Sequence, residues 1–301
     1  MHDRHNGRIS ATRDFTTIWD SAYFQADYIY NDYVKFVGGF QLNKPENLDH
    51  DISPRLGAIF TFDKNWGAKL LYGKVFRASY GGETGLDIPG FIVGNKELES
   101  EKINTFDAQI SYNTEKSFAA LTFYHSMMND VVGLGRADDG RITYVNGGSN
   151  EYSGIEFEGK TIISNELEMV GSMSYQIGEE LHNNNKNLGM IPRFMAKLGG
   201  SYKNDEGYSL SLFNSYYGDV VDNGVRNGAN PESDSHNILT ANAIFDLNNI
   251  FALKDLPSTI FTLYGKNLLD EKVYFPDVTN AVNTIPHISG RAFYGAITIK
   301  F

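Results

Sequence analysis

The sequence predicts an all-β protein, an antiparallel up-and-down transmembrane β-barrel of which about thirteen strands are present. Three observations predict this fold class. Apolar and polar residues alternate through most of the 301 residues, which is the period of strands with one apolar face. The connections between these runs are short and long in turn, as in barrels with turns on one side of a membrane and loops on the other. Aromatic residues flank nearly every short connection and would form a belt at one membrane interface.

The alternating runs follow one another as hairpins from Trp19 onward. They lie at residues 24–30, 34–42, 56–62, 66–72, 106–112, 119–123, 155–159, 167–177, 194–202, 208–212, 239–247, 261–265 and 293–301. The short connections are 31–32, 63–65, 113–117, 164–165 and 204–207, with 248–257 somewhat longer. The long ones are 43–52, 77–102, 133–150, 179–191, 219–235 and 269–291. The flanking aromatic pairs are Tyr30 and Tyr33, Phe62 and Trp66, Tyr112 and Phe118, and Tyr202 and Tyr208.

The last run is the cleanest. Phe293, Gly295, Ile297, Ile299 and Phe301 share one face of a strand long enough to cross a bilayer when tilted. A soluble β-sandwich whose aromatics pack a core is the alternative. Its strands should be nearer five or six residues, and its loops need not sort by length.

Composition excludes several other classes. A net charge of −11 argues against nucleic acid as a partner, because phosphate binding needs a basic surface. No cysteine is present, which removes disulfides, thiolate metal sites and cysteine nucleophiles. No apolar stretch is long enough for a transmembrane helix, and the polar first residues resemble no signal peptide.

The polar face predicts a wet lumen rather than an active site. Its charged members are Asp27, Arg55, Lys69, Asp107, Glu156, Glu158 and Lys160. No Ser-His-Asp set, carboxylate pair or metal-ligand spacing stands out from them, so we expect no enzyme activity, no cofactor and no metal site.

Six segments, in order, resemble the TonB-dependent outer-membrane receptors. They are Ser53-Pro54-Arg55-Leu56-Gly57, the Phe76-Arg77-Ala78 box, Asn95-Lys96-Glu97-Leu98-Glu99-Ser100-Glu101, Asn146-Gly147 with Gly154-Ile155-Glu156, Asn267-Leu268-Leu269-Asp270, and the strand from Gly290 to Phe301. The resemblance implies the C-terminal portion of a β-barrel of about 22 strands. Residues 1–18 are then expected to be the remnant of an extracellular loop, and residues 19–301 the C-terminal barrel strands. The family's signal peptide, TonB-engaging box and plug would belong to a missing N-terminal part.

The resemblance also implies a function. The chain would belong to an outer-membrane receptor of a Gram-negative bacterium that takes up a scarce solute, with a ferric siderophore as the expected example. Its expected partners are outer-membrane lipid, TonB through the missing plug region, the barrel-assembly machinery, and an extracellular metal chelate or other small solute. A passive porin-like channel is the alternative function, and a soluble β-rich binding protein is a third.

Four loop residues are candidate ligand contacts because cationic and aromatic groups suit anionic chelates: Arg77, Tyr80, Arg136 and Arg226. In the last strand, Phe293, Ile297, Ile299 and Phe301 are the residues that the assembly machinery is expected to recognise. Haem-binding members of the family carry a histidine between the Phe-Arg-Ala box and the Asn-x-x-Leu segment. Residues 79–94 contain none, so we expect a pre-chelated metal or small organic solute rather than haem. Ligation of haem iron by the phenolate of Tyr80 is the alternative.

Overall fold

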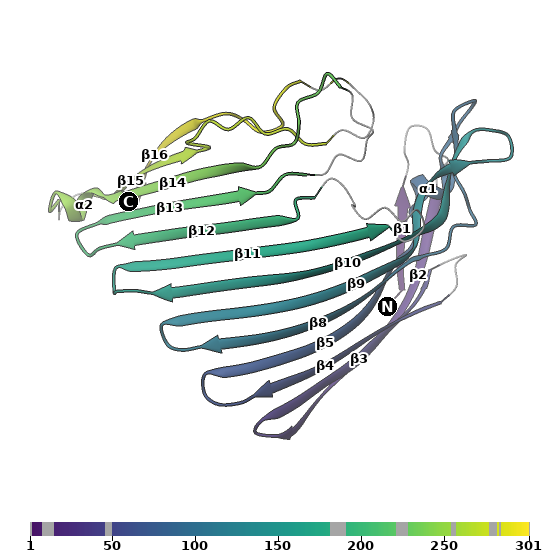
Figure 1. Cartoon of the computed structure of the whole chain (residues 1–301), viewed down its shortest axis with the longest axis horizontal. Helices are drawn as coiled ribbons and strands as arrows, with labels where there is room; N and C mark the ends of the chain where they lie inside the picture. Colours follow the sequence, from purple (N-terminus) through teal and green to yellow (C-terminus); the bar gives the residue numbers. More distant parts are fainter. Residues whose placement is uncertain are drawn as a thin grey trace. The chain divides into compact units, whose positions relative to one another are not determined.

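The computed structural model describes residues 2–7, 15–45, 50–180, 191–220, 228–253, 257–276, 282 and 284–300. These residues form one sheet in which the main strands pair antiparallel in the order of the chain, while two short strands, β6 and β7, lie off this order (Figure 1). The strands are β1 His2–Gly7, β2 Phe15–Asn31, β3 Val34–Pro45, β4 Asp51–Thr61, β5 Trp66–Arg77, β6 Asp87–Ile88, β7 Ile92–Val93, β8 Glu101–Asn113, β9 Ser117–Arg136, β10 Ile142–Ile162, β11 Leu167–Glu180, β12 Phe194–Lys203, β13 Tyr208–Tyr217, β14 His236–Asp246, β15 Ser258–Lys266 and β16 Ala292–Lys300. Two short helices, α1 Gly81–Gly85 and α2 Leu247–Ile250, complete the fold.

This arrangement confirms the predicted fold class and each of the thirteen predicted strands, which are β2–β5 and β8–β16. Among the described residues β1 does not pair with β16, so the sheet is not closed. No helix in this part of the chain is long and apolar enough to cross a membrane.

The structure also contains strands that the sequence did not predict. β1 pairs with residues 15–20 at the start of β2, and most of this ladder lies within residues 1–18, which were expected to be a loop remnant. β6 and β7 form a small ladder inside the 77–102 connection. The prediction of a long loop at 133–150 is wrong, because β9 and β10 continue to Arg136 and Ile142 and leave only 137–141 between them.

The chain divides into two compact units that each contain part of this sheet. The first comprises Met1–Ile110, Phe123–Ser153 and Gly178–Lys186, and the second Ser111–Thr122, Gly154–Ile177 and Asn187–Phe301. The first therefore holds β1–β7 with the long-loop ends of β8–β10. The second holds the short-turn ends of those strands and all of β12–β16.

Apolar side chains of the first unit line up across strands on one face. Phe24 faces Phe40 in register with ring centroids 6.1 Å apart, and Leu56 faces Tyr72. These side chains, like Phe106 further along the sheet, are exposed. In a membrane β-barrel the apolar face contacts lipid, so its side chains are exposed when the protein alone is considered.

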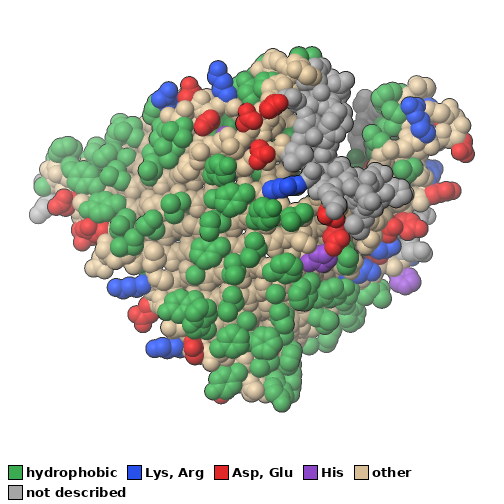
Figure 2. All heavy atoms as spheres, viewed as in Figure 1, with side chains coloured by type: hydrophobic (Ala, Val, Ile, Leu, Met, Phe, Trp, Pro, Cys, Tyr) green, Lys and Arg blue, Asp and Glu red, His purple; other side chains and the backbone are tan. Residues whose placement is uncertain are grey.

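The second unit repeats this pattern with large and small residues in register. One row crosses six strands on the apolar face: Met169, Gly200, Leu212, Ala241, Gly265 and Phe293. Leu198 on the same face is 60% exposed. Figure 2 shows hydrophobic side chains spread over the visible face of the strands, with charged side chains gathered towards the strand ends.

The short turns are closed by a side-chain acceptor at their first residue. The Asn31 Oδ1 atom accepts from the backbone amides of Tyr33 and Val34 at 2.9 Å each. Asp63, Thr114, Ser164 and Asn204 accept from backbone amides in the same way. Such turns favour Asn, Asp, Ser and Thr, and their sequences were therefore good signals of the hairpins.

Few apolar side chains of the described residues are buried. They are Pro45, Ile92, Leu98, Ala120 and Val273, whereas Asn43, Asp51, Ser53, Glu83, Ser100, Glu101, Thr143, Asn230 and Asn267 are buried polar groups. The alternative of a sandwich with a packed aromatic core is therefore not what the described residues form.

Candidate functional site

The 78–100 connection folds around the side chain of Arg77 at the end of β5. The Arg77 Nε atom donates to Glu101 Oε2 at 2.6 Å, and its two terminal nitrogens donate to the carboxylate of Glu83 at 3.1 Å each. Both carboxylates are buried, with side chains 7% and 8% exposed. Glu101 also accepts from the Val132 backbone amide on β9 at 2.8 Å. One guanidinium thus joins β5, α1, β8 and β9.

Glu83 orders the start of this connection. Its Oε2 atom accepts from the Tyr80 backbone amide at 3.1 Å, and the Glu83 carbonyl accepts from the Asn95 amide at 2.9 Å. The ring of Tyr80 lies over Gly82, where an added Cβ atom would come within 2.5 Å of the ring. The absence of a side chain at Gly82 therefore permits this close approach of the Tyr80 ring.

Two asparagines fasten this connection to β10. Asn95 Nδ2 donates to the Tyr144 carbonyl at 2.9 Å. Asn146 accepts from the Glu99 amide at 2.8 Å and donates to the Glu99 and Asp130 carbonyls at 3.0 and 2.7 Å. Leu98, between these residues in the connection, is buried. The loop is therefore held by side-chain hydrogen bonds in addition to its short strands.

Arg141 joins the β9–β10 turn to the same connection. It pairs with Asp139 at 2.7 Å and with Asp87 at 2.8 Å. Hydrogen bonds from the Arg141 amide and guanidinium lower the pKa of Asp139, and hydrogen bonds to Asp139 and then Asp87 raise the pKa of Arg141. β7 pairs in parallel with β10 just beside this turn.

We call the surface built from residues 77–102 and 130–141 the loop platform. Three of the four predicted ligand contacts can be placed on it. Arg77 is at its centre, but two carboxylates already occupy the guanidinium. Tyr80 is exposed, and Arg136 is exposed with one bond to the Gly140 carbonyl at 2.9 Å. Arg226 lies outside the described residues. Contact of these residues with a ligand stays a prediction.

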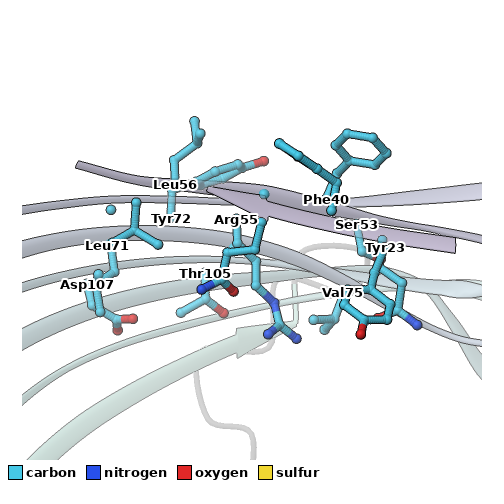
Figure 3. Close-up of a pocket in the computed structure, with 17 residues that line it drawn as sticks. Tyr23, Phe40, Ser53, Arg55, Leu56, Leu71, Tyr72, Val75, Thr105 and Asp107 are labelled. Carbon is cyan, nitrogen blue, oxygen red and sulfur yellow. The ribbon is translucent and has the colours of Figure 1, made fainter. Parts of the chain in front are cut away.

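A recess of about 470 Å³ lies in β2–β5 and β8 of the first unit. In Figure 3, Arg55, Thr105 and Asp107 point to the side of the sheet opposite Phe40, Leu56 and Tyr72, as the alternation predicts. Arg55 is flanked in register by Gly39 on β3 and Gly73 on β5. Because these neighbours have no side chain, the sheet backbone forms the floor beside the guanidinium.

The side of the sheet opposite the apolar stripe is polar near this recess. Asn43 Oδ1 accepts from Ser21 Oγ and from Gln41 Nε2 at 2.9 Å each, and Thr105 and Ser126 hydroxyls lie 2.8 Å apart. Lys35 pairs with Asp27 at 2.7 Å. These contacts fit the prediction of a wet face for Asp27, Arg55 and Asp107.

The Asn267-Leu268-Leu269-Asp270 segment forms a second ordered connection, in the other unit. Asn267 is fully buried with φ of +50°, and its side chain bonds the Glu271 amide and the Glu271 and Ser289 carbonyls at 2.9–3.1 Å. Asp270 Oδ1 accepts from the Arg291 amide at 2.8 Å, one residue before β16. The motif therefore sets where β16 begins.

β16 contains the residues that the barrel-assembly machinery is predicted to recognise. Phe293, Ile297 and Ile299 are exposed on one face and pair in register with Gly265, Phe261 and Thr259 of β15. Phe301 lies outside the described residues. Recognition of this strand by the assembly machinery stays a prediction.

Sequence reasoning missed the partners of Arg77. Glu101 closes the Asn-x-x-Leu segment, and Glu83 follows a Gly-Gly pair, but neither spacing predicts an ion pair with residue 77. The described residues contain no group of three or more His, Asp or Glu side chains placed to hold a metal ion.

An all-β sheet with short turns at one end, long connections at the other and an apolar exposed face is the architecture of a membrane β-barrel wall. A model of the family described as TonB dependent receptor-like, beta-barrel matches residues 3–268. The chain belongs to this family. No curated protein matches it.

Solved structures share its fold at low sequence identity. The siderophore receptor PirA from Pseudomonas aeruginosa has 14% identity and a TM-score of 0.74, with 99% of this chain and 50% of that chain covered. A mutant of the ferric enterobactin receptor PfeA from the same organism has 14% identity and a TM-score of 0.77, with 96% and 45% covered. The copper transporter OprC has 13% identity and a TM-score of 0.71, with 95% and 48% covered. The chain thus spans about half the length of these structures.

Proposed function

We propose that this chain is barrel wall and extracellular loop of an outer-membrane receptor of a Gram-negative bacterium. The receptor takes up a scarce solute with energy delivered through TonB, and a ferric siderophore is the expected solute. The family match over residues 3–268 is the observation that carries this proposal. The named functions of PirA, PfeA and OprC agree with it, since they are a siderophore receptor, a ferric enterobactin receptor and a copper transporter.

The loop platform gives the proposal a location. Arg77, Glu83, Asn95 and Asn146 hold the 78–100 connection in one conformation, which reduces the ordering cost of binding a solute. Tyr80 presents an exposed ring on this ordered loop. Lipid on the apolar face and the assembly machinery on β16 are the other partners we propose.

Energy dependence tests the proposal. Cells carrying the gene at its own locus should take up iron from ferric siderophores when starved, and uptake should stop when either the gene or TonB is removed. Uptake that persists without TonB and scales with concentration would instead support the passive porin-like channel.

The absence of a histidine in residues 79–94 supports a chelate over haem. Deletion of the gene should leave growth on haem as sole iron source unchanged. Loss of that growth on deletion, restored by complementation, would contradict this part of the proposal.

A further inference from the structure

Three cationic side chains of the loop platform each form ion pairs with two carboxylates. Each is shared by two carboxylates of the platform itself: Arg77 by Glu83 and Glu101, Arg141 by Asp87 and Asp139, and Lys102 by Glu99 and Asp130. The distances are 2.6–3.2 Å except for 3.9 Å between Lys102 and Glu99. Each group of three side chains therefore carries a net charge of one negative unit.

The platform as a whole is acidic. Residues 77–102 and 130–141 contain eight carboxylates and five Lys or Arg side chains, which gives a net charge of −3. Lys96 and Arg136 are the cations outside the three groups, and Glu97 and Asp138, both exposed, balance them. The platform has no surplus of positive charge to offer an anion.

Guanidinium groups are the usual means by which proteins bind anionic oxygen ligands, because their fork matches two oxygens at once. On this platform two of the three guanidinium groups bind carboxylates of the protein. An anionic chelate would have to displace those carboxylates, and its approach would be opposed by the negative surface.

Besides Lys96 and Arg136, the exposed groups of the platform include apolar side chains that suit a different ligand. Tyr80, Phe91 and Leu134 are 56%, 58% and 68% exposed on the platform. Aromatic and aliphatic surface beside carboxylates favours an organic ligand with no net charge or with positive charge, through stacking and cation attraction.

We infer that the solute of this receptor is a metal chelate of neutral or positive net charge, such as a ferric trihydroxamate, rather than an anionic tris-catecholate. This inference rests on the proposed function. The other segments predicted as outer loops have the same sign of charge: residues 43–52, 179–191, 219–235 and 269–291 contain five basic and twelve acidic residues.

Uptake of three probes tests the inference. Radiolabelled ferric iron is supplied to starved cells as a neutral trihydroxamate, as a trihydroxamate with an added amine, and as an anionic tris-catecholate. Gene-dependent and TonB-dependent uptake of either hydroxamate should exceed that of the catecholate by about tenfold or more at equal concentration, since one unfavourable charge contact is of this size.

A pair of variants tests the physical cause. Asp87→Asn with Asp139→Asn keeps the side-chain shapes but removes the two negative charges that neutralise Arg141, so catecholate uptake relative to hydroxamate uptake should rise by about tenfold. Asp205→Asn with Glu206→Gln, in a short turn, makes the same change in charge and should leave the ratio unaltered. Surface labelling of both variants corrects each rate for the amount of receptor.

The outcomes separate the two claims. Faster uptake of the catecholate, or uptake equal to that of the hydroxamates, overturns the inference and leaves the proposed function standing. TonB-dependent uptake of none of the probes overturns both. An unchanged ratio in the Asp87 and Asp139 variant, with receptor present at the surface, overturns the electrostatic explanation and the inference built on it.

Discussion

Arg77 and Asn267 each order a long connection with one side chain, because such connections have little backbone ladder of their own. Arg77 forms ion pairs with two buried carboxylates, and Asn267 forms three hydrogen bonds with backbone groups. Buried polar groups are costly to leave unpaired, so the loss of either side chain leaves a penalty as well as a missing contact.

Asn267→Ala should lower the free energy of unfolding by about 1–3 kcal/mol, because it removes the three hydrogen bonds that this buried side chain makes to backbone groups. The left-handed φ of this residue also disfavours alanine. Melting of the purified receptor and proteolysis within residues 267–291 measure the effect. Asn113→Ala, at an exposed position, is the control. Equal stability of the two variants would contradict the structural role of Asn267.

Glu101→Gln should loosen the 78–100 connection by removing the charge paired with Arg77. The expected cost is about 1 kcal/mol, since the Arg77 side chain is 42% exposed and solvent screens the pair. Protease cleavage between residues 78 and 100 should become faster. Glu97→Gln removes an exposed charge from the same segment and should not change the cleavage rate.

At the scale of strands, what could be predicted from sequence was the part set by local rules. Alternation located the thirteen long strands, and the turn residues Asn31, Asp63 and Ser164 located their hairpins. The outer halves of β9 and β10 were missed, because the sequence around Gly133, Gly135, Gly147 and Gly148 is typical of a loop, and the strands there depend on the pairing of β9 with β10. Arg77 could be singled out by its motif, but its partners could not, since Glu83 and Glu101 reach it through the fold.

The variant Leu198→Arg tests whether the apolar face of the strands contacts lipid. A charge on the lipid face near the midplane costs about 2–4 kcal/mol, so this variant should lower the amount of assembled receptor in the outer membrane. Lys160→Ala removes a half-exposed charge that pairs with Glu168 at 2.8 Å on the opposite face, and should have a smaller effect. Normal assembly of the Leu198 variant would place this residue away from lipid.

The two glycines that flank Arg55 allow a test of backbone packing, because one is closely packed and the other is not. A Cβ atom at Gly39 would lie 2.6 Å from the Phe24 carbonyl oxygen, whereas one at Gly73 would meet nothing within 4 Å. Gly39→Ala should therefore cost about 1–3 kcal/mol, as overpacking does, and Gly73→Ala close to nothing. Thermal melting of the two receptors compares them directly, and equal melting temperatures would refute the packing argument.

For the whole molecule, the two ends of the sheet path set the conditions for membrane insertion. In the described residues β1 and β16 are not paired with each other, and unpaired strand edges are not tolerated in hydrocarbon. Residues 1–301 expressed alone should therefore fail to give the heat-modifiable band of a closed barrel. A stable band of this kind would show that the two edges close on each other or on a second copy.

The length of the β9–β10 hairpin has a consequence for what meets the cell from outside. These strands contain 20 and 21 residues, and about ten suffice to cross the membrane. The rest would extend about 30 Å beyond the lipid surface. The turn at Asp138, Asp139 and Gly140 is then the natural epitope of the receptor, first reached by an antibody or a phage tail. A short peptide tag inserted there should be displayed on living cells.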